Sequence, residues 1–150
     1  MRPPVIRITK LTDYGVVIMA FMAGEPSRLF QARELAAETA VSRPTVSKLL
    51  KKLTKNKLLT SQRGTNGGYL LALAPEKISV AELVNVLEGP IAITECNLGN
   101  NHCPTASQCS LKAPWQRINN AITQALSSVK LSDLVNPMQN IGSEEHHGKH

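Results

Sequence analysis

The 150-residue sequence predicts a mostly α-helical protein with a small β-wing: a winged helix-turn-helix followed by a long dimerisation helix. Three observations predict this fold class. Two short helical patterns are separated by a tight turn, and the second of them is basic. Two short strand patterns around a glycine-rich turn follow them. A longer amphipathic pattern lies near the C-terminus and has the spacing of one more helix.

The first helix is expected at residues 10–23, where apolar side chains recur three and four positions apart. Residues 24–27 contain a glycine and a proline, which end it. A second, short helix is expected at residues 31–39, and residues 40–41 form the turn after it. The expected apolar face of the first helix consists of Leu11, Val17, Ile18, Phe21 and Met22.

A third helix is expected from Ser42 to about Asn56. Ser42 is a typical N-cap residue. Pro44 falls in the first turn, where its missing N–H costs nothing. The stripe that this helix buries is expected to consist of Val46, Leu49, Leu50 and Leu53.

Positive charge is concentrated on this third helix and the segment after it. The formal net charge is +6, and no Asp or Glu lies between Thr39 and Pro75. A block of one sign is typical of a surface that binds a polyanion, although a solvated helix face has the same composition. In a helix-turn-helix the second helix enters the major groove of DNA, with its N-terminal residues at the base edges. We therefore expect base contacts from Arg43, Thr45, Ser47 and Lys48, and phosphate contacts from Lys51, Lys52 and Lys55.

The wing is expected as two strands, residues 58–63 and 69–73, around the turn at residues 64–68. The glycines of this turn allow positive φ and a close approach of the backbone to DNA. Arg63 and Asn66 are the expected DNA contacts of the wing. A nucleotide-binding loop is the alternative, but the turn lacks a phosphate-binding spacing and no helix follows it directly.

Two further helices are expected after the wing. Ser79 and Glu82 form a capping box for a helix that runs to about Leu87. A longer amphipathic helix is expected from Pro114 to about Val129. We expect it to pair two copies of the chain, with folding back on its own domain as the alternative. The expected dimer contacts are Trp115, Ile118, Ile122, Leu126 and Val129.

All three cysteines lie within fourteen residues, in the pattern C-x6-C-x5-C. Cys96, Cys103 and Cys109 occur in a polar segment, and three thiolates on one loop can bind one soft metal centre. Zinc would take a fourth ligand, for which His102 is available but adjacent to Cys103. An iron–sulfur cluster also takes a fourth ligand. The spacing does not choose between the two metals, and three unconnected surface thiols are a further alternative.

The composition argues against several other classes. No window of 18 or more apolar residues is present, so we expect no membrane span. The first residues do not resemble a signal peptide, and we expect a cytoplasmic protein. A thiol oxidoreductase is disfavoured, because the cysteines include no C-x-x-C pair and no substrate pocket is evident from the sequence. We therefore expect neither an enzyme nor a small-molecule substrate.

Seven short segments together match one known family. They are spread between Ile8 and about Val135, and through them the chain resembles the IscR/NsrR family of winged-helix regulators. Within that family it is most similar to regulators of the SUF operon for iron–sulfur-cluster assembly. The matching segments are residues 9–15, 44–48, 63–69, 78–82, 87–92, 94–96 and 115–119.

The resemblance implies a homodimer that binds a palindromic operator in double-stranded DNA. It also implies an iron–sulfur cluster, 2Fe–2S or 4Fe–4S, on Cys96, Cys103 and Cys109. IscR-type members carry a histidine three residues after the last cysteine, where this chain has Lys112. NsrR-type members instead use an acidic residue of the partner subunit's first helix, a position that Asp13 matches. Asp13 also has an ordinary role, as a first-turn carboxylate at a helix N-terminus.

The resemblance implies a transcription regulator, either a repressor or an activator, of cluster-assembly genes. It would sense the status of its cluster, which responds to iron, redox state or nitric oxide. A metal-independent, thiol-based redox regulator is the alternative. The corresponding domain boundaries are 1–90 for the winged helix-turn-helix, 91–113 for the cysteine loop, 114–135 for the dimerisation helix with a short C-terminal helix, and 136–150 for a disordered tail.

Overall fold

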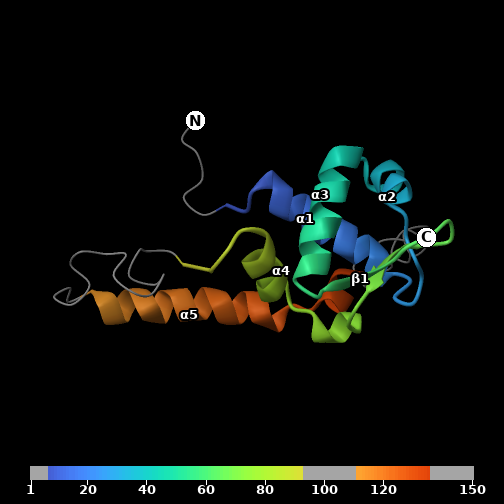
Figure 1. Ribbon diagram of the computed structural model, residues 1–150. Coiled ribbons are helices and arrows are strands. Elements are labelled where there is room, and N and C mark those ends of the chain that lie inside the picture. Colours follow the sequence, from blue (N-terminus) through green and yellow to red (C-terminus); the bar gives the residue numbers. More distant parts are fainter. Residues whose placement is uncertain (1–6, 93–110, 136–150) are drawn as a thin grey trace, which may run out of the picture.

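The computed structural model describes residues 7–92 and 111–135 (Figure 1). Within them the chain is mostly helical, with one two-stranded antiparallel sheet, so the predicted class is confirmed. No helix in these two ranges is long and apolar enough to cross a membrane. The elements are α1 (Lys10–Ala23), α2 (Ala32–Thr39), α3 (Arg43–Lys55), β1 (Leu59–Gln62), β2 (Gly68–Leu71), the 3-10 helix η1 (Pro75–Lys77), α4 (Val80–Leu87) and α5 (Lys112–Ser128).

Helix α1 begins and ends where the sequence predicts, but its buried face differs from the predicted one. Ile18 and Met22 are fully buried, whereas Val17 and Phe21 are exposed, so the assignment of these two residues to the core was wrong. Residues 16–23 are all apolar, and periodicity therefore cannot identify the inward face. The buried residues of α1 are Thr12, Gly15, Ile18, Met19, Met22 and Ala23.

Helix α3 buries the predicted stripe of four aliphatic side chains, and Ser42 is its N-cap. The Ser42 hydroxyl, however, makes no hydrogen bond to the helix backbone. Its oxygen lies 2.7 Å from the Thr45 hydroxyl oxygen, so the two side chains pair with each other. Pro44 is the second helical residue and has no N–H to offer, which leaves fewer backbone donors for the cap.

The wing contains a strand contact that the sequence did not reveal. β1 and β2 pair with Leu59 opposite Leu71 and Gln62 opposite Gly68. Phe30, between α1 and α2, adds a single bridge on the other side of β2. The Phe30 amide donates to the Tyr69 carbonyl at 2.7 Å, and the Tyr69 amide donates to the Phe30 carbonyl at 2.8 Å. This bridge ties the wing to the start of the helix-turn-helix.

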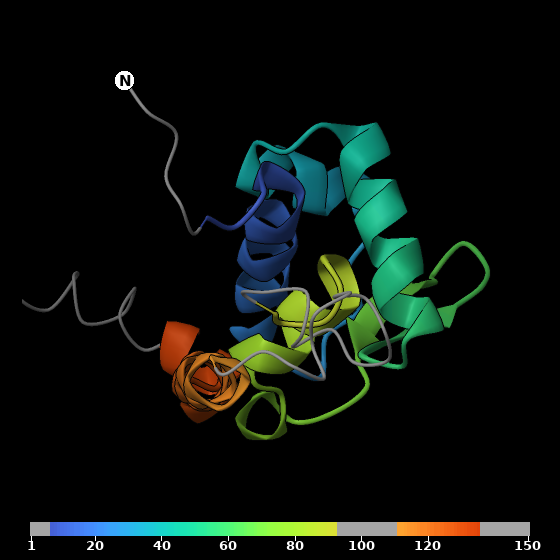
Figure 2. The same cartoon turned by 90° about the vertical axis from the view of Figure 1, so that its left-hand side faces the viewer.

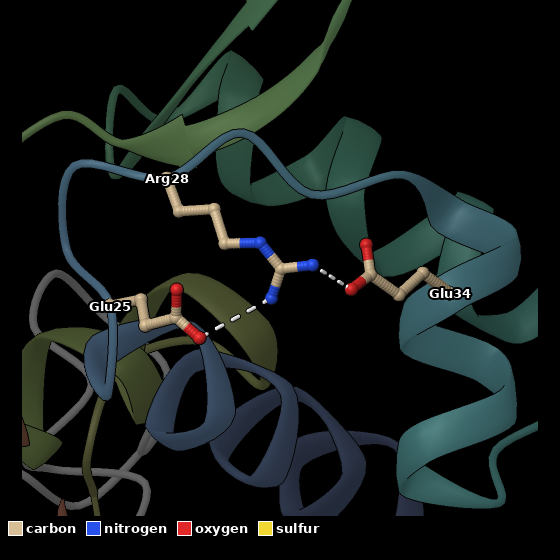
Figure 3. A network of polar contacts seen from close by, with 3 residues as sticks. All are labelled: Glu25, Arg28 and Glu34. Carbon is tan, nitrogen blue, oxygen red and sulfur yellow. Dashed lines mark hydrogen bonds and ion pairs between the residues drawn. The ribbon is translucent and has the colours of Figure 1, made fainter.

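The connection from α1 to α2 is held by the side chain of Arg28 (Figure 3). Its guanidinium forms ion pairs with Glu25, at 3.5 Å, and with Glu34. It also lies 4.5 Å from the centre of the Phe30 ring. Exposed ion pairs add little stability each. We interpret this cluster as fixing the direction in which the chain enters α2.

The residues that follow α5, up to residue 135, pack against the winged domain. The capping box of Ser79 and Glu82 is present at the start of α4. The Val80 amide donates to the Val129 carbonyl at 2.9 Å, and the Leu131 amide donates to the Ile78 carbonyl at 2.8 Å. Residues 131–135 are helical, and Leu131 is fully buried in the same core as α1 and α3. In Figure 1 the N-terminal part of α5 extends beyond this domain.

Candidate nucleic-acid interface and cysteine segment

The outer face of α3 carries the predicted positive charge. Val46, Leu49, Leu50 and Leu53 occupy the inner face, which leaves the charged positions outside. Thr45 and Ser47, in the first half of the helix, are half-buried residues. The exposed basic residues of α3 are Arg43, Lys48, Lys51, Lys52 and Lys55.

One lysine of this face has a partner inside the protein. The Lys52 ammonium donates to the Leu87 carbonyl at the end of α4, at 3.1 Å. No hydrogen bond or ion pair links the side chain of Lys48, Lys51 or Lys55 to any residue in the described ranges. These three ammonium groups are therefore available to an anion.

The turn of the wing presents Arg63 and Asn66, which are both exposed. Gly64 has φ of +109°, a conformation that favours glycine. At Gly67 a Cβ would lie 2.1 Å from the Gln62 carbonyl oxygen, so no larger residue fits at this position without a shift of the backbone. Figure 2, in which α5 is seen end-on, places α3 and the wing together on the side of the domain away from α5. The structure thus brings the two predicted sets of DNA contacts to one side.

Asp13 lies in the first turn of α1 and is exposed. The start of α1 is fixed by the Thr9 amide, which donates to the Glu88 carboxylate at 2.6 Å. Cys96, Cys103 and Cys109 lie outside the described residues, so their distance from Asp13 is not defined. Within residues 7–92 and 111–135 no three His, Cys, Asp or Glu side chains are grouped as metal ligands would be. Lys112, three residues after Cys109 in the sequence, is the first residue of α5.

The contact between Thr9 and Glu88 works like a capping box that is formed between two helices. The Thr9 hydroxyl accepts from the Thr12 amide, and the Thr9 amide is satisfied by a carboxylate that belongs to the end of α4. The hydrogen bond from the Thr9 backbone lowers the pKa of Glu88 below its usual 4.5. Partial burial opposes this shift, and the hydroxyls of Thr9 and Thr12 reinforce it.

Helix α5 leaves much of its apolar stripe uncovered. Trp115 is 37%, Ile118 45% and Val129 36% exposed, whereas Ile122 and Leu126 are half-buried. The buried residue of α5 is a polar one. Asn119 is 8% exposed and donates from its side-chain amide to the Ile91 carbonyl at 3.1 Å. This contact could not be predicted from the sequence, because a polar residue within an amphipathic helix is normally assigned to its solvent side.

Known proteins resemble this chain over most of its length. A model of the Rrf2 family, described as an iron-dependent transcriptional regulator, matches residues 8–137. The HTH-type transcriptional regulator IscR of Photorhabdus laumondii is 33% identical over 132 residues, which cover 87% of this chain and 80% of that protein. The HTH-type transcriptional regulator NsrR of Bacillus licheniformis is 29% identical over 132 residues, covering 87% and 92%.

A solved structure has the same fold. It is CymR, the global cysteine regulator of Bacillus subtilis, with a TM-score of 0.69 and 28% sequence identity. The superposition covers 87% of this chain and 97% of that one.

Proposed function

Because this chain belongs to the Rrf2 family of transcriptional regulators, we propose that it binds operator DNA under the control of its three cysteines. The observation that carries the proposal is the joint surface of α3 and the wing. That surface presents exposed Lys48, Lys51 and Lys55 together with Arg63, and the sequence between Thr39 and Pro75 contains no carboxylate to neutralise it. Phosphates along a DNA backbone are the natural partners of such a surface.

The proposed docking places α3 in the major groove. Arg43, Thr45, Ser47 and Lys48 stand in its first half and would contact base edges. Lys51, Lys52 and Lys55 follow and would contact phosphates, while Arg63 and Asn66 would reach the backbone or the minor groove from the wing.

A homodimer would place one α3 in each half of a palindromic operator. The two half-sites would then lie about 34–36 Å apart, one turn of the double helix. The uncovered stripe of α5, with Trp115 and Ile118 exposed, supports pairing of two copies through that helix.

The donor set fits an iron–sulfur cluster. Cys96, Cys103 and Cys109 would supply three soft thiolates. The exposed Asp13 carboxylate of the partner subunit would supply the fourth ligand. When bound, a 2Fe–2S or 4Fe–4S cluster would supply a centre that responds to iron, oxidants and nitric oxide. We propose cluster-assembly genes as the targets, because the supply of clusters would then control the expression of the genes that assemble them.

A second candidate is a thiol-based regulator that needs no metal. It is favoured by the structural similarity to CymR, which in Staphylococcus aureus has also been solved in an oxidized form, with a TM-score of 0.64 and 25% sequence identity. In this reading the same three cysteines would act through oxidation of their thiols. The protein would then be colourless, and its DNA binding would respond to reductant but not to iron.

One experiment separates the two candidates. The full chain is purified without oxygen, and its visible absorption, iron and acid-labile sulfide are measured. A cluster predicts a visible band with both elements present, and loss of that band in Cys103→Ala. No metal at all would overturn the cluster and leave the thiol regulator, whereas zinc without sulfide would overturn both candidates. An Asp13→Ala variant with unchanged cluster stability would remove Asp13 as a ligand.

A further inference from the structure

Residues 87–91, here called the junction, connect the end of α4 to the segment that carries the cysteines. Cys96 follows Ile91 by five residues. The junction is hydrogen-bonded to three different helices. Its Leu87 carbonyl accepts from Lys52 of α3 at 3.1 Å, and its Ile91 carbonyl accepts from Asn119 of α5 at 3.1 Å. At Glu88 the carboxylate accepts from the amide of Thr9, the N-cap of α1, at 2.6 Å.

The bond from Lys52 joins the junction to the helix that we propose reads DNA. The Leu87 carbonyl belongs to the last turn of α4, where carbonyls have no partner within the helix. A positive charge at that end also interacts favourably with the helix dipole. Lys48, Lys51 and Lys55 on the same face make no such bond within the part of the chain described. Lys52 is therefore distinguished from the other basic residues of α3 by a contact 35 residues away in the chain.

Leu87 is also held by its side chain. A Cβ placed on Gly15 of α1 would lie 2.4 Å from a terminal methyl carbon of Leu87, so the two helices are in close contact there. Leu87 is 4% exposed. The chain then turns at Gly89, whose φ is +118°. Leu87 is thus held at two points, since its side chain packs against α1 and its carbonyl accepts from Lys52 of α3.

We propose that Lys52 is a positioning residue that makes the orientation of α3 depend on the junction, and thereby on the state of the cysteine segment. The inference rests on the proposed sensing function and adds the residue that couples the cysteine segment to α3. Coupling requires that the contact differ in free energy between the two states of the segment. An ammonium group has three donors, so Lys52 can hold the Leu87 carbonyl and still approach a phosphate. The salt dependence of operator binding in a Lys52 variant therefore does not by itself reveal the positioning role.

The test compares Lys52→Met with Lys51→Met in the full chain. Both variants keep most of the length of the side chain and lose its charge, but of the two lysines only Lys52 contacts the junction. Operator affinity is measured before and after treatment with iodoacetamide and a chelator. All three cysteines lie in the one segment, so alkylation acts only there. The quantity of interest is the ratio of the two Kd values.

Wild type and Lys51→Met are expected to show a ratio of at least about fivefold, and Lys52→Met a ratio near one. Hydrogen exchange gives a second readout on the untreated proteins. The Glu88 amide, bonded to the Val84 carbonyl at 2.8 Å, should exchange faster in Lys52→Met than in Lys51→Met.

A wild-type ratio that differs from one and persists in Lys52→Met would overturn this inference alone, as would equal exchange at Glu88 in both variants. A ratio of one in the wild type would overturn the sensing function as well.

Discussion

A few side chains fix the relative positions of the elements that form the proposed DNA-reading surface. Arg28 joins the α1–α2 connection to α2 through its ion pairs with Glu25 and Glu34. Phe30 lies beneath that arginine and bridges to Tyr69 of the wing. These contacts link the connection, α2 and the wing, so the wing and the helix-turn-helix are positioned by the same few residues.

Gly68 is required where the wing passes Phe30. A Cβ at this position would lie 2.6 Å from the Phe30 carbonyl oxygen, which is backbone and cannot rotate away. We expect Gly68→Ala to lower the free energy of unfolding by about 1–3 kcal/mol, as overpacking does elsewhere. Urea denaturation measures the effect. Thr65→Ala, at an exposed position of the same turn, is the control, and a Gly68→Ala protein as stable as that control would contradict the prediction.

Glu88 makes part of the stability depend on pH. Its pKa is lowered in the folded protein, chiefly by the hydrogen bond from the Thr9 backbone. The stabilisation is therefore complete above the unfolded carboxyl value near 4.5 and is lost as pH falls through the lower folded value.

We expect Glu88→Gln to cost no more than about 1 kcal/mol at neutral pH, because the carboxylate is exposed to solvent. The difference from wild type should shrink as pH falls below 4.5. Urea denaturation at neutral and acidic pH measures both effects. Glu76→Gln, at an exposed position of η1, is the control. A stability difference for Glu88→Gln that stays constant across this range would argue against the assignment.

Helix α3 packs one face against the core and exposes the opposite face to solvent. Lys51→Met should weaken operator binding and lower the slope of log K against log salt by about 1, because one phosphate contact is lost. Fluorescence anisotropy at several salt concentrations measures this slope. Lys77→Met removes an exposed charge from η1 and should leave it unchanged. An unaltered slope in Lys51→Met would mean that the docking of α3 is wrong.

Elements with strong local signals could be predicted from the sequence. The bounds of α1, the capping box at Ser79 and the buried stripe of α3 follow from spacing and capping chemistry. Contacts between distant segments could not. The bridge at Phe30 is a strand of one residue, which has no periodicity to detect, and the bond from Lys52 to Leu87 depends on how two helices meet.

For the whole molecule, α5 is the proposed contact between two copies. Ile118 is 45% exposed on a helix whose apolar stripe is largely uncovered. We expect the wild type to sediment as a dimer and Ile118→Glu to sediment as a monomer, because a buried unpaired charge is strongly unfavourable at an interface. Leu73→Glu, at a position 43% exposed outside that helix, is the matched control. Dimers of equal stability in both variants would exclude this face of α5.

The burial of Leu131 bears on how the protein is made. Translation delivers this residue after α3 and the wing, yet its side chain completes the core that supports them. A nascent chain released early would lack a fully buried leucine, a loss comparable to the roughly 2–5 kcal/mol of a Leu→Ala change in a core. A chain that ends before Leu131 is thus expected to carry α3 and the wing on a less stable core, which full-length synthesis completes.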